Sequence, residues 1–174
     1  MRTTIIGGLT ATLIAASLFF ASPGLAGDHD DDDPYIGCAL FLAQDQTAVQ
    51  GGTDDDDHCK GFGGKDVIKG HRGDDHLRAL GSKDVVRGQR GDDVVRGGHH
   101  GDLVAGGMGD DRIEGGLGWD LLVGGIGHDD ICLGPGHNIV MAEDHRRDRI
   151  FGANDNDVVY RDRGDALLDR PCPF

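Results

Sequence analysis

The chain has 174 residues, a length that fits one domain with some additional segments. Its 31 acidic residues against 17 basic ones give a formal net charge of -14, which excludes nucleic acid as a partner because phosphate binding needs a basic surface. Glycine, at 31 residues, is far above its usual share of about 7 %, and aromatic residues make up only 5 %, which excludes a thick aromatic core. Such an acidic chain stays disordered unless its carboxylates are neutralised, and a divalent cation is the natural candidate.

Residues 1–26 have the features of a Sec signal peptide. A positive charge at Arg2 precedes an apolar run over residues 5–21, and a small-residue cleavage signal ends at Ala26. The alternative is an uncleaved membrane anchor, which Pro23 at the end of the run disfavours. We expect a secreted, extracellular protein with no membrane span in the mature chain.

The segment that follows, residues 27–51, is expected to be an acidic tail and an N-terminal cap. The acidic run at residues 28–33 predicts a solvated tail, with weak and unspecific cation binding as the alternative. Residues 34–49 hold an apolar cluster, which we assign to capping the first coil of a repeat structure, because an open strand edge invites pairing with other chains.

Four cysteines, an even number in an exported chain, predict disulfides. Three pairings are possible. We favour Cys38–Cys59 and Cys132–Cys172, because each pair would tie a flank of the chain to the nearest end of the repeats. A zinc site is the alternative, but no C-x-x-C motif is present.

Residues 52–160 repeat every nine positions. The clearest blocks span residues 97–132 and read GGHHGDLVA, GGMGDDRIE, GGLGWDLLV and GGIGHDDIC. Position eight is apolar throughout, and position six is Asp at residues 57, 66, 75, 84, 93, 102, 111, 120 and 129. Asn138 takes the next position six, an extra residue then shifts the frame, and Asp148 and Asp157 resume it.

The two columns have different physical roles. A short strand points the position-eight side chain inward, and β-branched residues suit that buried surface. The first six residues must turn the chain, and glycine supplies the positive φ angles of such turns. A turn of this kind aims backbone carbonyls toward a common point, and a carboxylate at its end completes a set of hard oxygen ligands of the kind that calcium prefers.

This nonapeptide, G-G-x-G-x-D-x-U-x, resembles the repeats of the haemolysin-type (RTX, repeats-in-toxin) calcium-binding family. The resemblance implies an all-β fold, a parallel β-roll (β-solenoid) of about six 18-residue coils capped at both ends. Loops eighteen residues apart would then stack about 4.8 Å apart, with a cation between two loops taking oxygens from both. Asp57, Asp75, Asp93, Asp111 and Asp129 would line one edge, and Asp66, Asp84, Asp102, Asp120 and Asn138 the other. Without cations each edge is a row of like charges, so we expect several Ca2+ ions and folding coupled to them.

The predicted metal site consists of position-six side chains and loop glycines. The side chains are those of Asp57, Asp66, Asp75, Asp84, Asp93, Asp102, Asp111, Asp120, Asp129 and Asp157. The glycines are Gly88, Gly91, Gly106, Gly107, Gly109, Gly115, Gly116, Gly118, Gly124, Gly125 and Gly127. Weaker or missing sites are expected at 79–84, which opens with Ala79 and Leu80, at 97–102, which has His100 in place of glycine, and at Asn138.

Other features do not indicate catalysis. There is no H-E-x-x-H zinc motif and no G-x-S-x-G nucleophile elbow, the histidines are scattered, and no cofactor other than calcium is expected. Position nine is basic in five successive repeats, at Lys60, Lys69, Arg78, Arg87 and Arg96. These cations either hinder pairing of the sheet with other chains and balance the acidic loops, or they bind an anionic polysaccharide. The two-sheet geometry divides them between opposite faces.

The tail, residues 161–174, loses the glycine pattern and is assigned to a C-terminal cap. The repeats cover most of the mature chain and leave no room for a toxin or protease domain, so we expect no enzyme. We expect a monomeric calcium-binding protein with a structural or adhesive role outside the cell. The alternative is a non-catalytic accessory module of a polysaccharide-modifying enzyme, or a binder of an anionic cell-surface polymer. An ice- or carbohydrate-binding solenoid is a third hypothesis, and the lack of Thr-x-Thr ladders counts against ice.

Overall fold

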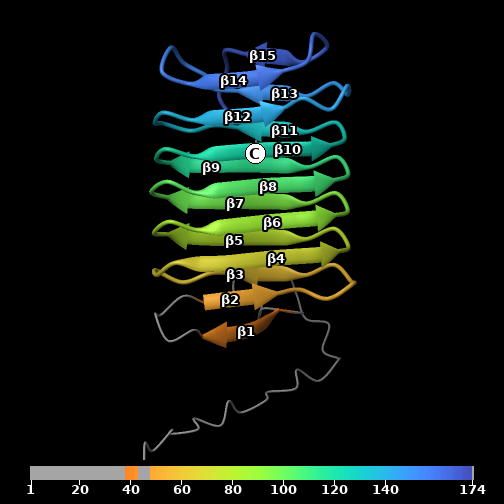
Figure 1. Cartoon of the computed structure of the whole chain (residues 1–174), viewed down its shortest axis with the longest axis vertical. Helices are drawn as coiled ribbons and strands as arrows, with labels where there is room; N and C mark the ends of the chain where they lie inside the picture. Colours follow the sequence, from red (N-terminus) through yellow and green to blue (C-terminus); the bar gives the residue numbers. More distant parts are fainter. Residues whose placement is uncertain (1–37, 43–47, 174) are drawn as a thin grey trace, which may run out of the picture.

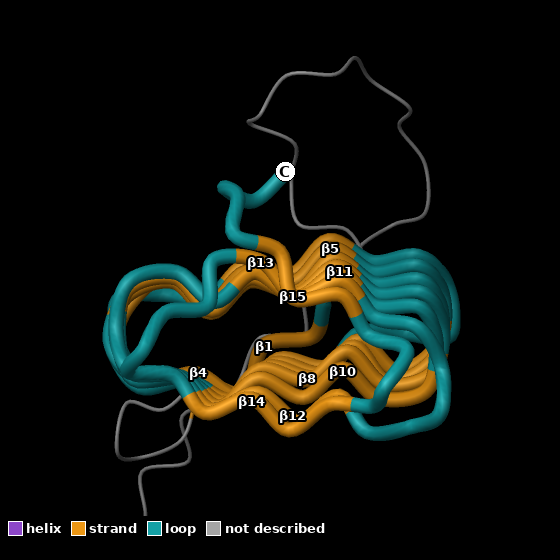
Figure 2. The backbone as a smooth tube through the Cα atoms, turned by 90° about the horizontal axis from the view of Figure 1, so that it is seen from above, coloured by secondary structure: helices purple, strands orange, loops and turns teal. Residues whose placement is uncertain are grey.

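The computed structural model describes residues 38–42 and 48–173, which form strands and connecting turns with no helix. The predicted signal peptide and the acidic run at residues 28–33 lie outside the described residues. The strands stack along one axis into a column (Figure 1), and a view along that axis shows a flattened tube with two sheets facing each other and loops at both edges (Figure 2). Among the described residues there is no helix long and apolar enough to cross a membrane.

The chain alternates between two sheets. The first sheet contains, in spatial order, β1 (Ala39–Leu42), β2 (Ala48–Gly51), β4 (Asp66–Arg72), β6 (Val85–Arg90), β8 (Leu103–Met108), β10 (Leu121–Ile126), β12 (Ile139–Ala142) and β14 (Val158–Arg161). The second contains β15 (Ala166–Leu168), β13 (Arg149–Phe151), β11 (Asp130–Cys132), β9 (Arg112–Leu117), β7 (Val94–His99), β5 (His76–Gly81) and β3 (His58–Lys60). All neighbours are parallel except β1 and β2, which pair antiparallel.

Each coil has eighteen residues, as the two-repeat period implies. Val86 pairs with Val104, and Leu103 pairs with Leu121. The extra residue after Asn138 is absorbed locally, because Ile139 pairs with Val158 nineteen residues on. The predicted β-roll is confirmed, with seven coils from β2/β3 to β14/β15 rather than about six, because β2 and β15 add strands outside residues 52–160.

The core is a single column of inward side chains between the sheets. Because strand residues alternate between faces, each short strand buries its position-eight residue. Those 0–1 % exposed are Ile68, Leu77, Val86, Val95, Val104, Ile113, Leu122, Ile131, Val140 and Ile150. Position one also points inward, and Ala79 and Leu133 join the same cluster. The core is therefore narrow and leaves the position-six carboxylates at its two edges.

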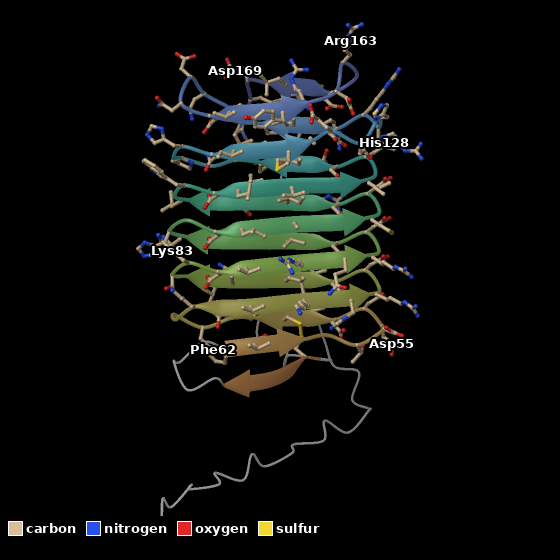
Figure 3. The ribbon with its side chains drawn as sticks, in the orientation of Figure 1. Asp55, Phe62, Lys83, His128, Arg163 and Asp169 are labelled. Atoms are coloured by element: carbon tan, nitrogen blue, oxygen red, sulfur yellow. A yellow bond between two sulfur atoms is a disulfide. The ribbon has the colours of Figure 1, made fainter. Side chains whose placement is uncertain are left out.

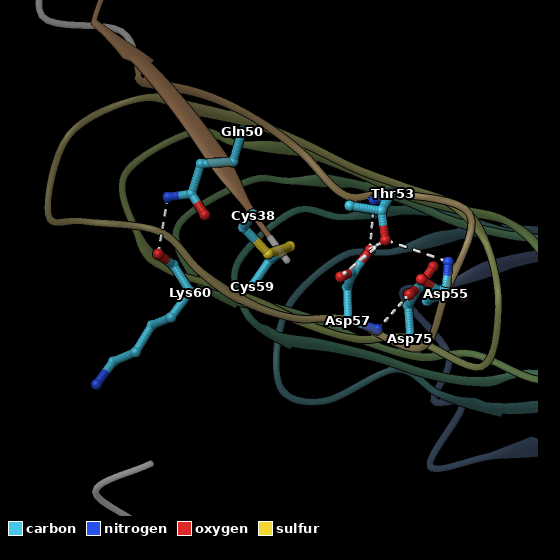
Figure 4. Close-up of a disulfide and its surroundings, with 8 residues drawn as sticks. All are labelled: Cys38, Gln50, Thr53, Asp55, Asp57, Cys59, Lys60 and Asp75. Atoms are coloured by element: carbon cyan, nitrogen blue, oxygen red, sulfur yellow. Dashed lines mark hydrogen bonds between the residues drawn. A yellow bond between two sulfur atoms is a disulfide. The ribbon is translucent and has the colours of Figure 1, made fainter. Parts of the chain in front are cut away.

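Both predicted disulfides are confirmed. Cys38 bonds to Cys59 of β3, with 5.7 Å between their Cα atoms (Figure 4), and Cys132 of β11 bonds to Cys172 at the same Cα separation. No cysteine within the described residues is free, so no thiolate remains there for the zinc alternative. The second disulfide holds the C-terminal tail over the outer face of the second sheet (Figure 2).

Candidate metal centre

The position-six aspartates form two continuous hydrogen-bonded stacks. On the first edge, Oδ1 of Asp75 accepts the backbone N–H of Asp57, and Oδ1 of Asp93 accepts that of Asp75, both at 2.8 Å. The same bond repeats up this edge through Asp111, Asp129, Asp148 and Asp165. The second edge repeats it through Asp66, Asp84, Asp102, Asp120, Asn138 and Asp157. Apart from Asp57 and Asp66, which begin the stacks, each aspartate of the stacks uses Oδ1 to join its loop to the preceding coil. The two residues are eighteen apart in sequence, or 17 to 19 around the frame shift.

The other oxygen of most of these aspartates is buried without a partner. The unpartnered atoms are Oδ1 of Asp66 and Oδ2 of Asp75, Asp84, Asp93, Asp102, Asp111, Asp120, Asp129 and Asp148. A buried carboxylate oxygen with no donor is unfavourable and indicates a missing water or ion. Eight of these atoms are Oδ2 in two periodic rows, and they are best explained by cations that occupy the same place in successive loops.

Burial and mutual repulsion oppose ionisation of these groups. Loss of hydration, only partly offset by the backbone N–H donor, raises the pKa above the usual 3.8 throughout the rows. The pKa is about 6 for Asp75, Asp84 and Asp148, about 7 for Asp93, Asp102 and Asp129, and about 8 for Asp111. Neighbouring carboxylates add to the increase, so at neutral pH the stacks need positive charge beside them.

The predicted glycines line the same space. A Cβ on the position-one glycines, Gly88, Gly106, Gly115 and Gly124, would come within 3 Å of the aspartate of its own loop. A Cβ on Gly91, Gly107, Gly109, Gly116, Gly118, Gly125 or Gly127 would come within 3 Å of a backbone carbonyl oxygen eighteen residues earlier. Carbonyl oxygens and carboxylates thus face the gaps between stacked loops, where only glycine leaves room.

Asn138 provides an internal comparison. Its Oδ1 accepts the N–H of Asp120 at 3.0 Å, as the aspartates do for their neighbours. Its second side-chain atom is a nitrogen, Nδ2, and this donates to the carbonyl of Gly134 at 3.2 Å. The Nδ2 of Asn138 thus donates to a backbone carbonyl oxygen. An aspartate at position six has an oxygen in place of this nitrogen, so we expect a cation that binds both the carboxylate oxygen and the carbonyl oxygen. Within the described part of the chain no three His, Cys, Asp or Glu side chains converge on one point, so backbone carbonyls must supply many of the ligands.

Three of the predicted ligands differ from the rest. The Oδ2 of Asp66 accepts the backbone N–H of Phe62 at 2.6 Å, so its unpartnered atom is Oδ1. Both oxygens of Asp57 have partners within the chain, because Thr53 donates its backbone N–H and its hydroxyl (Figure 4). Asp157 is only half-buried, and its Oδ2 accepts the N–H of Asn154 at 2.8 Å. Conversely, Asp148 has an unpartnered oxygen but was not among the predicted ligands. Its signal was the resumed repeat at residue 143, which puts an aspartate at position six.

The loops predicted to be weaker show backbone strain. Leu80 and Ser82 in the loop 79–84, and His100 in the loop 97–102, have positive φ angles of 90°, 93° and 77°. His71 and Gln89, which lie outside the loops predicted to be weaker, share this strain with φ of 92° and 93°. Asp84 and Asp102 still keep an unpartnered oxygen, so the ranking of the sites stays a prediction.

The two edges are not equivalent, a difference that sequence reasoning missed. On the first edge position five is also acidic, and the N–H of Asp74 donates to Asp56, that of Asp92 to Asp74 and that of Asp110 to Asp92. In these bonds the acceptor belongs to the earlier coil, whereas in the bonds of position six it belongs to the later coil. The second edge has Lys65 and Lys83 at position five. Figure 3 shows Lys83 on one loop edge and His128 on the other. The consecutive Asp-Asp pairs at 56–57, 74–75, 92–93 and 110–111 were the available signal.

Comparison with known protein families agrees with this geometry. The model of the RTX calcium-binding nonapeptide repeat matches residues 49–77, 60–95, 81–113, 96–131, 105–140 and 146–168, which is more than half of the chain. No curated protein matches the chain. Repeats of this family bind Ca2+, are structural rather than catalytic, and are typical of secreted proteins, in keeping with the two disulfides. The chain belongs to the RTX calcium-binding nonapeptide repeat family, and calcium binding follows from its repeats.

Proposed function

We propose that the chain is exported with residues 1–26 as its signal peptide, folds around several calcium ions, and then acts as a structural or adhesive module outside the cell. The observation that carries the calcium-coupled part is the set of nine buried carboxylate oxygens without partners. The disulfides and the family's association with secretion support the extracellular part.

The residues that would hold calcium are those of the two stacks. On the first edge we assign Asp75, Asp93, Asp111, Asp129 and Asp148, and on the second Asp66, Asp84, Asp102 and Asp120, each with carbonyl oxygens of its own and a neighbouring loop. Bound calcium supplies the positive charge that keeps these buried carboxylates ionised. The chain itself aligns the loops through the Oδ1 bonds and excludes water from the carboxylates by burial.

A second candidate role is an accessory module that holds an anionic polymer. The observation that favours it is the cationic outer face of the second sheet, which has Lys60, Arg78, Arg96, Arg112 and Arg149 at outward positions.

The calcium-coupled part is tested by far-ultraviolet circular dichroism of the disulfide-intact chain, titrated with calcium from a chelated start. We expect a cooperative gain of β signal with calcium and none with equal magnesium, because magnesium demands a stricter octahedral geometry. A signal that does not respond to calcium would contradict the proposal.

The export part is tested separately. The full chain, expressed in a bacterium with its own N-terminus, should appear outside the cytoplasm with a mass that corresponds to a start at Gly27. A full-length product retained inside the cell would contradict export and leave calcium binding unaffected.

A further inference from the structure

The outer faces of the two sheets differ in chemistry. On the first sheet the outward positions of β8, β10, β12 and β14 are apolar, with Ile139, Met141 and Tyr160 about half exposed. On the second sheet, the outward positions from β3 to β13 carry five Lys or Arg residues and two histidines against only Glu114 and Asp130. A chain with a net charge of -14 thus gathers positive charge on one face.

Part of this positive charge has no counter-charge. Arg96 pairs with Glu114 at 3.0 Å, and Arg149 pairs with Asp130. Arg78 and Arg112 are exposed and form no ion pair with any described residue. Arg78 and Arg112 are therefore not neutralised by an ion pair within the described part of the chain.

Two adjoining hollows shape this face into a groove. The first has a volume of about 490 Å³ and is lined by His76, Arg96, Arg112, Asp130 and Arg149. Two residues of the C-terminal tail, Arg170 and Pro173, also line it. The disulfide Cys132–Cys172 holds that tail in place. The second, about 520 Å³, shares Arg96 and is lined also by Arg78 and by Gly98, Gly116 and Gly134, which present bare backbone. Together the hollows span several coils.

We propose that this groove binds an anionic polysaccharide, with Arg78, Arg96 and Arg112 contacting its carboxylate or sulfate groups. The planar guanidinium donates two parallel hydrogen bonds to such groups. Arg78 and Arg96 pair in adjacent coils, about 4.8 Å apart. Arg112 lies in the coil after Arg96, opposite Val94, so the three guanidinium groups follow one another along the axis of the column. A floor of glycines lets a sugar ring approach the backbone. The polysaccharide would be the partner of the extracellular module proposed above, and its binding rests on that proposed function.

The observations favour a polysaccharide over a nucleic acid. Binding of single-stranded nucleic acid relies on aromatic side chains that stack on bases. Neither hollow contains Phe, Tyr or Trp among its lining residues.

The test compares two charge-reversed variants of the full, calcium-loaded chain. One is Arg78→Glu with Arg112→Glu in the groove; the matched control is Lys69→Glu with Arg87→Glu, at outward positions of the first sheet. Fluorescently labelled hyaluronan serves as the carboxylate probe, heparin as the sulfate probe and neutral dextran as the blank, with binding followed by anisotropy. We expect the groove variant to bind at least about tenfold more weakly and the control to bind as the unaltered chain does.

Other outcomes overturn the inference: no binding to either anionic probe, equal weakening by both variants, or tighter binding to duplex DNA than to the polysaccharides. The variant Arg78→Gln with Arg112→Gln covers the case in which charge reversal disturbs folding. Circular dichroism with calcium is recorded for every protein. A chain that folds with calcium but binds no probe overturns only this inference, whereas a chain that ignores calcium overturns the proposed function first.

Discussion

Asp111 lies in the middle of the first-edge stack, where its replacement by asparagine separates the two roles of the carboxylate. It is 1 % exposed, its Oδ1 accepts the N–H of Asp93 at 2.8 Å, and its Oδ2 has no partner. Asn138 shows that an amide fits this kind of position, with Oδ1 in the stack and Nδ2 on a carbonyl. Asp111→Asn should therefore keep the stack intact and remove one calcium ligand.

The size of the effect follows from the pKa of Asp111. Burial raises this pKa from 3.8 to about 8, so the calcium-free fold holds the proton more tightly than the unfolded chain does. Stability gained in this way is fully present below about pH 4 and is lost as the pH rises through 8. At pH 7 the group must take up a proton on folding, which costs about 3 pKa units, the distance between pH 7 and the ordinary pKa, or up to about 4 kcal/mol. The neutral amide removes this penalty, so Asp111→Asn should stabilise the calcium-free fold by up to that amount at pH 7.

The assay is urea unfolding followed by circular dichroism, in chelator and in calcium, at pH 7 and at pH 3.5. In chelator the variant should be more stable, or retain more β signal, at pH 7 and should match the unaltered chain at pH 3.5. In calcium it should be less stable and bind fewer ions by calorimetry. Asp111→Ala is the control, since it removes the charge but leaves the N–H of Asp93 without its acceptor. Equal destabilisation by Asp111→Asn with and without calcium would refute the reasoning.

Three further predictions concern the loops and the ends. Gly109→Ala should lower the stability of the calcium-loaded chain by about 2 kcal/mol or more in thermal unfolding, because φ is 131° and a Cβ would meet the carbonyl of Gly91. The control is Gly63→Ala, where a Cβ would have nothing within 4 Å. This variant should change the stability by less than about 0.5 kcal/mol. Calcium affinity measured by calorimetry should fall steadily from pH 8 to pH 5, since carboxylates with pKa values of about 6 to 8 must lose protons to bind; a flat profile would contradict the ligand assignment. Replacing Cys132 and Cys172 by alanine should lower the urea midpoint and reduce the free energy of unfolding by about 2–5 kcal/mol, because the disulfide closes a loop with a sequence separation of 40. An unchanged midpoint would show that the tail adds no stability.

The architecture was predictable because its determinants are strictly periodic. An apolar residue at every ninth position from Ile68 to Val140 can be buried only if successive strands alternate between two sheets. The disulfides were predictable because each links one end of the repeats to a flank. Local spacing indicated the disulfides, whereas the two-sheet arrangement came from the resemblance of the repeat to the RTX family.

The finer features of the site depend on the axial direction of the stack, which spacing does not reveal. Position-six carboxylates accept from the preceding coil, whereas Asp74 and Asp92 at position five accept from the following one. Both columns look alike in the sequence. Asp57 differs from its neighbours only because Thr53 happens to provide donors, and Asp148 was left out of the predicted ligands because it follows a shift of the repeat frame.

The central claim is that the unpartnered carboxylate oxygens bind calcium. A crystal structure of the calcium-loaded chain, with an anomalous difference map, tests it most directly. We predict peaks in successive loops, about 2.3–2.6 Å from Oδ2 of Asp75, Asp93, Asp111 and Asp129. Ions bound only at the exposed carboxylates of residues 54–56, or loops with no ion in saturating calcium, would contradict it.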